Sequence, residues 1–286
     1  MDVSFLDDIK SLVCLVRGFR ELGVWVLRAR PVRSSGRVQA DDISIFYRRY
    51  GCGEPVLMLH GGFMFAETWG RQIPAIQENY EVIATDARGH GRTTLGTHPL
   101  TYRQMADDAI RLIESLELGP VHLVGWSDGG CVSLGVAIER PDLVRSMVLL
   151  GTSFSVDNYS SATRAEIEKF MRWYSPELML FRAGRWIMSP EALTTAEFIR
   201  RMGEMWRELP DYTFEEMGRI EAPTLVIGTN RDEWLSMWPD PLKVFKETAE
   251  AIPGAELRVI PGGTHLVHII QPGTVNPIIL DFLARH

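Results

Sequence analysis

A single serine stands at the centre of a turn whose neighbours suit a nucleophile. Residues 125–129 read Gly-Trp-Ser-Asp-Gly and match G-x-S-x-G, between the apolar run VHLVGW and the helix-like pattern CVSLGVAIERP. A sharp turn from a strand into a helix crowds the backbone, so the positions two before and two after the serine must be small. The turn also places the hydroxyl at the positive N-terminus of the following helix. The pattern predicts Ser127 as a nucleophile, with an incidental serine in a glycine-rich turn as the alternative.

A serine hydroxyl is a weak nucleophile near neutral pH and needs a base, which in turn needs an acid to fix its tautomer. Among the seven histidines, His265 lies in the loop PGGTHLVH after the last predicted strand, and His268 is expected only to pack beside it or support it. Asp232 lies in the loop TNRDE after the preceding strand, where Glu233 is the alternative acid. A solvated surface carboxylate is the other interpretation of Asp232. The chain order Ser127, Asp232, His265 at one sheet edge predicts a catalytic triad.

Acyl transfer develops a negative charge on the carbonyl oxygen, and backbone N–H groups must be aimed at that charge. One donor is expected to be the amide of Asp128, directly after the serine. The other is expected in the segment HGGF, from Gly62, with Phe63 as the alternative donor. Glycines in this segment allow the backbone to approach a substrate closely.

Short apolar runs alternate with helix-like patterns from residue 42 onward, which indicates an α/β fold with a parallel sheet and helices on both faces. The segment 153–220 contains no strand-like run and is rich in helix formers and large aromatics, so it is predicted to be a helical cap. Strands are expected at 43–50, 56–60, 81–86, 121–126, 146–151, 223–228 and 255–260, and helices at 101–118, 131–141 and 275–286.

The chain is expected to divide into an N-terminal amphipathic helical extension (1–37), the first part of the core (38–152), the cap (153–220) and the second part of the core (221–286). Charged residues interrupt the apolar N-terminal stretch, so no membrane-crossing helix is expected there, and the acidic residues before it are unlike a secretion signal. Its apolar face either packs on the domain or a second copy of the chain, or lies on a membrane surface.

The composition excludes some classes of function. The 286 residues carry a formal net charge of −7, without the basic footprint of a nucleic-acid-binding protein. The three cysteines are widely spaced and form neither a disulfide framework nor a zinc pattern. We therefore expect no metal, no cofactor and no nucleic-acid partner. A cytoplasmic location is expected, with association with a membrane through residues 1–37 as the alternative.

From residue 42 to the C-terminus the chain resembles the α/β-hydrolase family. The similarity is carried by HGGF with Trp69, DARGHGRT, GWSDGG, PTLVIGTNRDE and PGGTHLVH. The resemblance implies an eight-stranded, mostly parallel sheet with a helical cap inserted after the sixth strand. It assigns the triad roles to the serine, aspartate and histidine named above, and the donor roles to Gly62 and Asp128. It implies that Arg88 and His90 belong to the scaffold.

Three features depart from or refine that resemblance. The acid loop is one residue longer than the G-x-x-D spacing of many relatives, which leaves the placement of Asp232 open. A serine at the nucleophile position argues against the epoxide-hydrolase and haloalkane-dehalogenase branches. The turn GWSDGG is similar to that of valacyclovir-hydrolase-like enzymes, in which the carboxylate after the serine can bind a substrate amino group. That role for Asp128 is a hypothesis.

The aromatic side chains of the cap, together with Trp126, Trp234 and Trp238, predict an apolar or aromatic substrate pocket, although at least half of the cap aromatics are expected to form the core of the cap. The expected function is a serine hydrolase that cleaves a small-to-medium hydrophobic ester, thioester or lactone through an acyl-enzyme on Ser127. The same scaffold could instead serve C–C bond hydrolysis, cofactor-free lyase or perhydrolase chemistry, or acyl transfer. A non-catalytic ligand-binding relative is disfavoured, because a binding module needs no triad.

Overall fold

A computed structural model describes residues 32–172, 175–235 and 240–286 of the chain. Residues 1–31 of the predicted helical extension (1–37) and Trp238 lie outside these described residues. Within them, eight strands form one sheet in the order β1-β2-β4-β3-β5-β6-β7-β8. The strands are β1 (Ser34–Ala40), β2 (Ile43–Tyr50), β3 (Glu54–Leu59), β4 (Tyr80–Thr85), β5 (Val121–Trp126), β6 (Val144–Leu150), β7 (Thr224–Thr229) and β8 (Glu256–Ile260).

The sheet is parallel except at one edge, where β1 pairs antiparallel with β2 and β2 pairs antiparallel with β4. Neighbouring central strands pair in parallel, and β3, β5 and β6 are buried on both faces. Continuous apolar runs are typical of such doubly covered strands. The fold class expected from the sequence, an eight-stranded and mostly parallel sheet with helices, is confirmed.

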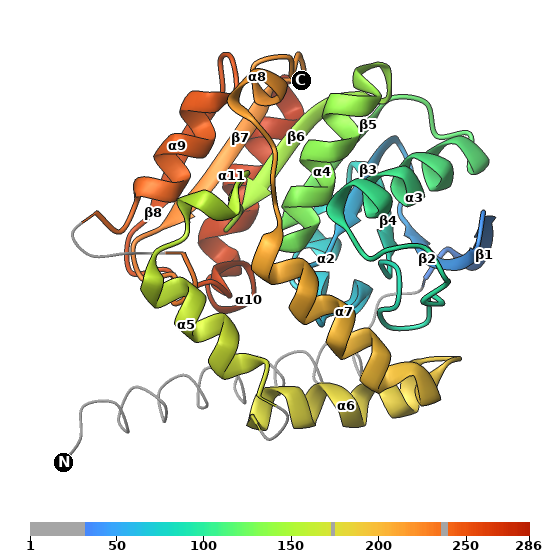
Figure 1. Cartoon of the computed structure of the whole chain (residues 1–286). Helices are drawn as coiled ribbons and strands as arrows, with labels where there is room; N and C mark the ends of the chain where they lie inside the picture. The colour runs from blue at the N-terminus through green and yellow to red at the C-terminus, as the bar shows by residue number, and fades with distance from the viewer. Residues whose placement is uncertain (1–31, 173–174, 236–239) are drawn as a thin grey trace.

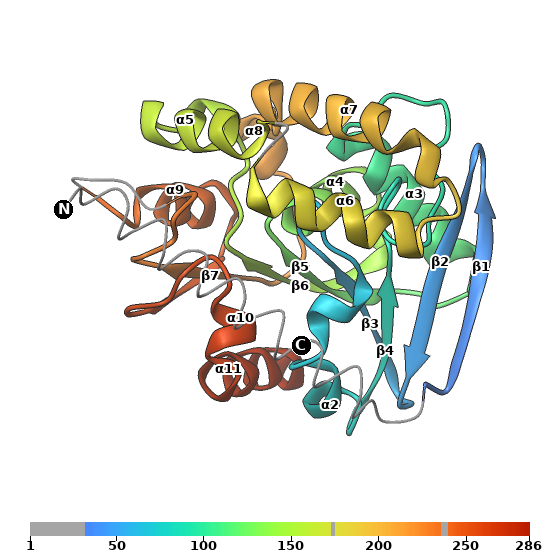
Figure 2. The same ribbon diagram turned by 90° about the horizontal axis from the view of Figure 1, so that it is seen from below.

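The strands contribute alternate residues to two separate apolar cores, because successive side chains point to opposite faces of a sheet. The helices α3, α4 and α9 close one core, and α2 and α11 close the other, as Figure 2 shows above and below the strands. The helices are α2 (Ile73–Ile76), α3 (Tyr102–Ser115), α4 (Asp128–Glu139), α5 (Ser161–Phe170), α6 (Pro176–Met188), α7 (Thr195–Glu208), α8 (Phe214–Met217), α9 (Lys243–Ala251), α10 (Val267–Ile270) and α11 (Pro272–Arg285).

The structure differs from the sequence-based expectation at one sheet edge. The predicted boundary between residues 37 and 38 falls inside β1, so the sheet begins at Ser34. The sequence SSGRVQA did not predict this strand, because only Val38 and Ala40 are buried in it. An exposed edge strand needs few apolar residues, and its alternating pattern is correspondingly weak. Helix α9 was not predicted either.

Between β6 and β7 the described residues form the helices α5, α6, α7 and α8; α5, α6 and α7 lie together at one end of the core, whereas α8 stands apart from them at the top of the view (Figure 1). Local caps begin three of them, because side-chain oxygens accept otherwise unpaired N–H groups of the first turn. Ser160 caps α5 in this way, Ser175 caps α6, and Thr213 forms a capping box with Glu216 at α8. Four aromatic rings of this segment pack around Phe63 of the core, with ring centroids 4.7–5.7 Å away; they are Phe170, Phe181, Phe198 and Trp206.

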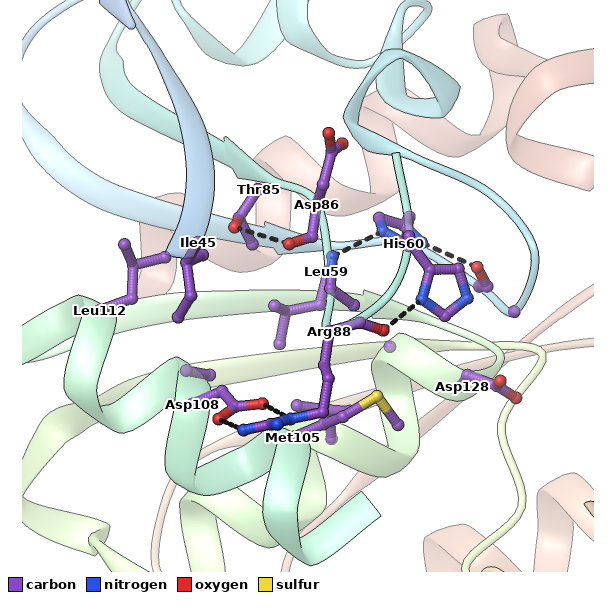
Figure 3. A pocket seen from close by; sticks show the side chains of 17 residues that line it. Ile45, Leu59, His60, Thr85, Asp86, Arg88, Met105, Asp108, Leu112 and Asp128 are labelled. Carbon is purple, nitrogen blue, oxygen red and sulfur yellow. Dashed lines mark hydrogen bonds and ion pairs between the residues drawn. The ribbon is translucent and has the colours of Figure 1, made fainter. Parts of the chain in front are cut away.

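The loop after β4 is anchored by a buried arginine. Arg88 is 1% exposed and meets Asp108 of α3 in a two-bond pair, with nitrogen–oxygen distances of 2.8 and 2.7 Å (Figure 3). Its guanidinium also donates to Asp42, which lies between β1 and β2, at 2.7 Å. The arginine thus joins the edge hairpin, the β4 loop and α3. This position agrees with the scaffold role that the sequence resemblance implied.

Removal of this guanidinium should destabilise the fold strongly. The substitution Arg88→Ala leaves two carboxylates, Asp42 and Asp108, without their buried cation, and breaking a buried pair from one side costs about 3–5 kcal/mol. Urea unfolding followed by circular dichroism should show a much lower midpoint. Arg140→Ala is the matched control, because Arg140 pairs with Asp142 and Glu114 at the exposed surface. Equal midpoint shifts for the two variants would contradict the anchoring role of Arg88.

Candidate active site

Ser127 stands at the junction of β5 and α4 in a backbone conformation that is rare for a side chain other than glycine. Its φ is +54° and its ψ is −120°. Such a conformation costs of order 1–3 kcal/mol and persists only where the surroundings impose it. Here the amide of Ser127 donates to Leu150 of β6 at 2.8 Å, while its carbonyl accepts from Gly130 at 2.8 Å. The turn is therefore held from the neighbouring strand and from the first turn of α4.

The two flanking glycines permit close contacts that no other residue would allow. A Cβ on Gly129 would collide with the backbone carbonyl of Leu59 at the end of β3, and a Cβ on Gly125 would lie 2.5 Å from the carbonyl of Gly129. Real Cβ atoms essentially never come so close to other heavy atoms. The requirement for small residues that the sequence pattern implied is thus present in the fold.

His265 and Asp232 meet directly although they are 33 positions apart in the chain. The imidazole Nδ1 of His265 lies 2.8 Å from Oδ2 of Asp232, and both side chains are nearly fully buried. The other carboxylate oxygen of Asp232 accepts the backbone N–H groups of Trp234 and Leu235, each at 2.9 Å. Gly151, after β6, leaves room for the pair, because a Cβ there would lie 3.2 Å from Nδ1.

The long acid loop still delivers its aspartate to the histidine. The amide of Arg231 donates to Gly263 of the histidine loop at 3.1 Å, which ties the two loops together. Glu233, the alternative acid, accepts the backbone N–H of His265 at 2.9 Å, so it contacts the backbone of the histidine and not its ring nitrogens. It therefore holds the histidine loop, and Asp232 is the carboxylate that orients the imidazole.

Electrostatics around His265 favour its protonated form. Burial alone would lower the pKa of this imidazole, but the charge of Asp232 and its hydrogen bond more than offset burial, so the pKa is raised. The bond to Asp232 also places the ring proton on Nδ1, because a carboxylate accepts hydrogen bonds. The other ring nitrogen, Nε2, is then left as the basic atom.

One cavity of about 130 Å³ collects most of the predicted site residues. Ser127, His265, Trp126 and Trp234 line it, and the indole of Trp126 donates to the carbonyl of His265 at 2.9 Å. The predicted donors Gly62, Phe63 and Asp128 line the same cavity. Its walls are mainly apolar and aromatic. The structure thus brings the predicted residues together, apart from Asp232, which reaches the site through His265, and Trp238, which lies outside the described residues.

The amide of Phe63 is already engaged. It donates to Nε2 of His90 at 3.0 Å, while Nε2 of His60 accepts the amide of Ala87 at the same distance. His90, in the loop after β4, therefore binds the loop after β3, and His60 binds in the opposite direction. The Nδ1 atom of each ring faces a backbone carbonyl. Phe63 is thus not available as the second donor to an oxyanion, and Gly62 is the candidate that we retain. Sequence reasoning missed this exchange because its partners lie 27 positions apart.

Both of these histidines are held in the neutral form. Burial lowers the pKa of His60, and burial together with the neighbouring His60 lowers the pKa of His90 well below its usual value. A neutral ring can donate from one nitrogen and accept at the other, which is the pattern observed. The chemistry of His60 and His90 is therefore structural, as the resemblance implied for His90.

Asp128 has two partners that sequence reasoning did not identify. Its carboxylate accepts the hydroxyl of Tyr102 from α3 and the indole N–H of Trp206 from α7, each at 2.9 Å. Burial raises the pKa of Asp128 to about 6, although both donors favour the charged form. Asp128 also lines a second, smaller cavity, together with Gly61 and Gly62; Figure 3 shows this cavity from close by.

His268 packs behind the site and does not line the cavity. Its ring lies between those of Trp69 and Trp126, at centroid distances of 5.1 and 4.5 Å. Burial lowers the pKa of His268 to about 3, with His265 as a second cause. A ring that stays neutral among indoles supports the position of Trp126, and this agrees with the packing role expected for it.

Among the described ranges, no group of three or more His, Cys, Asp or Glu residues is placed to hold a metal ion. In the same ranges, every helix is too short or too polar to span a bilayer.

Comparisons with known proteins extend these observations. The profile of the Alpha/beta hydrolase family matches residues 56–277. A (E)-2-((N-methylformamido)methylene)succinate hydrolase from Acinetobacter baylyi is 41% identical over 104 residues, which cover 36% of this chain and 40% of that protein. The human serine hydrolase BPHL is 26% identical over 282 residues, covering 91% of this chain and 92% of that one. The meta-cleavage product hydrolase CumD from Pseudomonas fluorescens IP01 shares the fold, with a TM-score of 0.71, 23% identity and coverage of 89% and 98%.

The close approach at Gly129 predicts a position-specific response to a methyl group. Gly129→Ala should lower Tm by several degrees or prevent folding, because the new Cβ meets the backbone of β3, which cannot retreat without breaking the sheet; overpacking of this kind costs about 1–3 kcal/mol. Gly184→Ala is the matched control. Gly184 lies inside α6 with open space around its Cα, and alanine is favoured there by up to about 1 kcal/mol. Thermal melts that place both variants at or above the wild type would refute the crowding.

Proposed function

The chain belongs to the Alpha/beta hydrolase family, and we propose that it is a serine hydrolase that acts through an acyl-enzyme on Ser127. Its substrate would be a small-to-medium hydrophobic carboxylic ester, thioester or lactone. One observation carries the proposal. Ser127, in its strained turn, lines the same cavity as His265. The Nδ1 atom of His265 is hydrogen-bonded to the buried Asp232 at 2.8 Å.

In the proposed mechanism, Nε2 of His265 accepts the proton of Ser127 as the hydroxyl oxygen attacks the carbonyl carbon. Asp232 holds the imidazole in the tautomer that leaves Nε2 free, and it stabilises the imidazolium that forms. The amides of Gly62 and Asp128 donate to the oxyanion of the tetrahedral intermediate. His265 then protonates the leaving group, and a water molecule activated by the same histidine hydrolyses the acyl-enzyme.

The lining of the cavity supports an uncharged or cationic substrate over an anionic one. Three carboxylates line the cavity, those of Asp128, Glu177 and Glu233, and the described lining residues include neither lysine nor arginine. A negative group on the substrate would enter this site against like charges. The remaining walls are dominated by aromatic and aliphatic side chains, which favour a hydrophobic acyl group.

We also propose a small-molecule acyl compound as the ligand and the cytoplasm as the compartment. Cys52 and Cys131 are free thiols, which suits a reducing environment. Contact with a membrane or with a second copy through residues 1–37 remains a hypothesis about a segment that is mostly outside the described residues.

Covalent labelling tests the proposed nucleophile. A fluorophosphonate probe should label the wild-type protein, and Ser127→Ala should abolish both labelling and turnover of nitrophenyl esters, because it removes the proposed nucleophile. Ser161→Ala, which alters an exposed serine at the start of α5, should behave like the wild type. Esters of short and medium chain length should react faster than long ones, given the size of the cavity. A wild-type protein that is not labelled would refute the proposed nucleophile. Labelling without ester turnover would instead support acyl transfer or C–C bond chemistry at the same serine.

The rate should depend on pH through His265. The base must be unprotonated, and its pKa is raised, so kcat/KM should rise with pH to a plateau, with a midpoint above about 6.5, the usual value for histidine. The sign follows from the protonation state, because acid protonates Nε2 and removes the acceptor for the serine proton. Initial rates with a nitrophenyl ester between pH 5 and 9 would measure it. A midpoint below 6.5 would show that the charge and hydrogen bond of Asp232 do not outweigh burial at this ring.

A further inference from the structure

Asp128 joins three parts of the protein that are separate in the sequence. It begins α4 directly after Ser127, and its carboxylate accepts one bond from α3 and one from α7. The donor on α3, Tyr102, belongs to the core, whereas the donor on α7, Trp206, belongs to the helices between β6 and β7. The carboxylate is therefore a direct polar link between the nucleophile helix and the segment that covers the site.

The same link lies against the loop that carries the proposed donor Gly62. A Cβ on Gly62 would collide with the indole of Trp206 and would lie 2.5 Å from Oδ2 of Asp128. The next residue, Phe63, packs its ring 5.2 Å from that of Trp206, and its amide is held by His90 on the core side. The loop is thus enclosed between the His90 bond on one side and the Asp128–Trp206 pair on the other.

The carboxylate depends on these two neutral donors. Asp128 is 9% exposed, and the described residues that line the cavity provide no lysine or arginine to balance its charge. A buried acceptor left without its donor bears the full cost of lost solvation, so it moves toward water or another donor. If the Trp206 N–H is removed, the carboxylate should reorient within the cavity, and the indole position above Gly62 should loosen with it.

We propose that Asp128 and Trp206 form a latch that positions the Gly62 amide for the oxyanion. The latch fastens α7 to the first turn of α4, so the covering helix and the two backbone donors take up their places together. Asp128 is then a positioning residue whose carboxylate acts through Trp206, in addition to lending its own amide. The inference rests on the proposed function, because it concerns the stabilisation of the same tetrahedral intermediate.

This role differs from contact with a substrate amino group. A positioning latch affects the transition state of every acyl substrate, because the oxyanion is common to all of them. A carboxylate that reads an amino group affects only substrates that carry one. The two roles therefore separate when neutral and amino-bearing esters with the same leaving group are compared.

The test uses Trp206→Phe, which removes the N–H but keeps an aromatic ring against Phe63. Loss of a whole oxyanion donor lowers kcat about 10²–10³-fold, so displacement of one should lower kcat roughly tenfold. KM should change by less than about twofold, and the inhibition constant of a matching trifluoromethyl ketone, which forms the tetrahedral adduct, should rise by about the same factor as kcat falls. Trp186→Phe, a cap variant at an exposed tryptophan, should match the wild type.

Two variants of Asp128 complete the experiment, and melts establish that each protein is folded. Asp128→Asn keeps an oxygen that can accept the indole N–H, so it should lose less kcat than Asp128→Ala, by the same factor on both esters. Asp128→Ala removes that acceptor, and adding Trp206→Phe to it should lower kcat by less than about twofold more, because both changes break the same bond.

The outcomes are distinct. The proposal is supported by equal losses on neutral and amino-bearing esters for Trp206→Phe. It is overturned if Trp206→Phe matches the wild type in kcat and in inhibitor affinity, or if Asp128→Ala loses activity only on amino-bearing esters. Failure of the wild type to react with a fluorophosphonate would instead contradict the proposed function itself.

Discussion

The close approach of α4 to the end of β3 is the constraint on which the rest of the site depends. Gly129 lies against the carbonyl of Leu59, so the helix begins directly beside the segment that follows β3. Ser127 precedes this contact in a positive-φ conformation between strand and helix. The amide of Asp128 and the loop with Gly62 are thereby brought to the same cavity. A bulkier residue at the helix start would separate the proposed nucleophile from both proposed donors.

Around this contact the loops are fixed by buried polar pairs rather than by regular secondary structure. His60 and His90 exchange bonds between the β3 and β4 loops, and Arg88 anchors the second loop to α3. The His265–Asp232 pair holds the loops after β7 and β8 together in the same manner. Rigid loops of this kind suit a site whose chemistry relies on preorganised donors, because little reorganisation remains for the reaction itself.

The sequence predicts the parts of this arrangement that local pattern controls. The turn around Ser127 and the central strands follow from small residues and continuous apolar runs, and the loops of Asp232 and His265 follow from strand order. Strand β1 was not predicted, since an exposed strand at the edge of the sheet has too few buried side chains to form an alternating pattern. The partners of Asp128 and of the Phe63 amide escaped it as well. Those bonds join elements that meet only after tertiary docking, and no spacing along the chain reports which donor will face which acceptor.

The exchange between His60 and His90 also has a thermodynamic consequence. Both rings are neutral in the fold, with a lowered pKa, whereas the unfolded chain binds protons on histidine at about pH 6.5. Because of this proton linkage, the two neutral rings stabilise the fold fully above that pH, and their contribution is lost progressively as the pH falls below it. A proton on either Nε2 would displace the backbone N–H that the nitrogen accepts. It would thereby break one of the two hydrogen bonds that join the loops after β3 and β4. Acidification therefore weakens the hold on the loop that carries the proposed oxyanion donor through equilibrium proton uptake, separately from any titration of the proposed base.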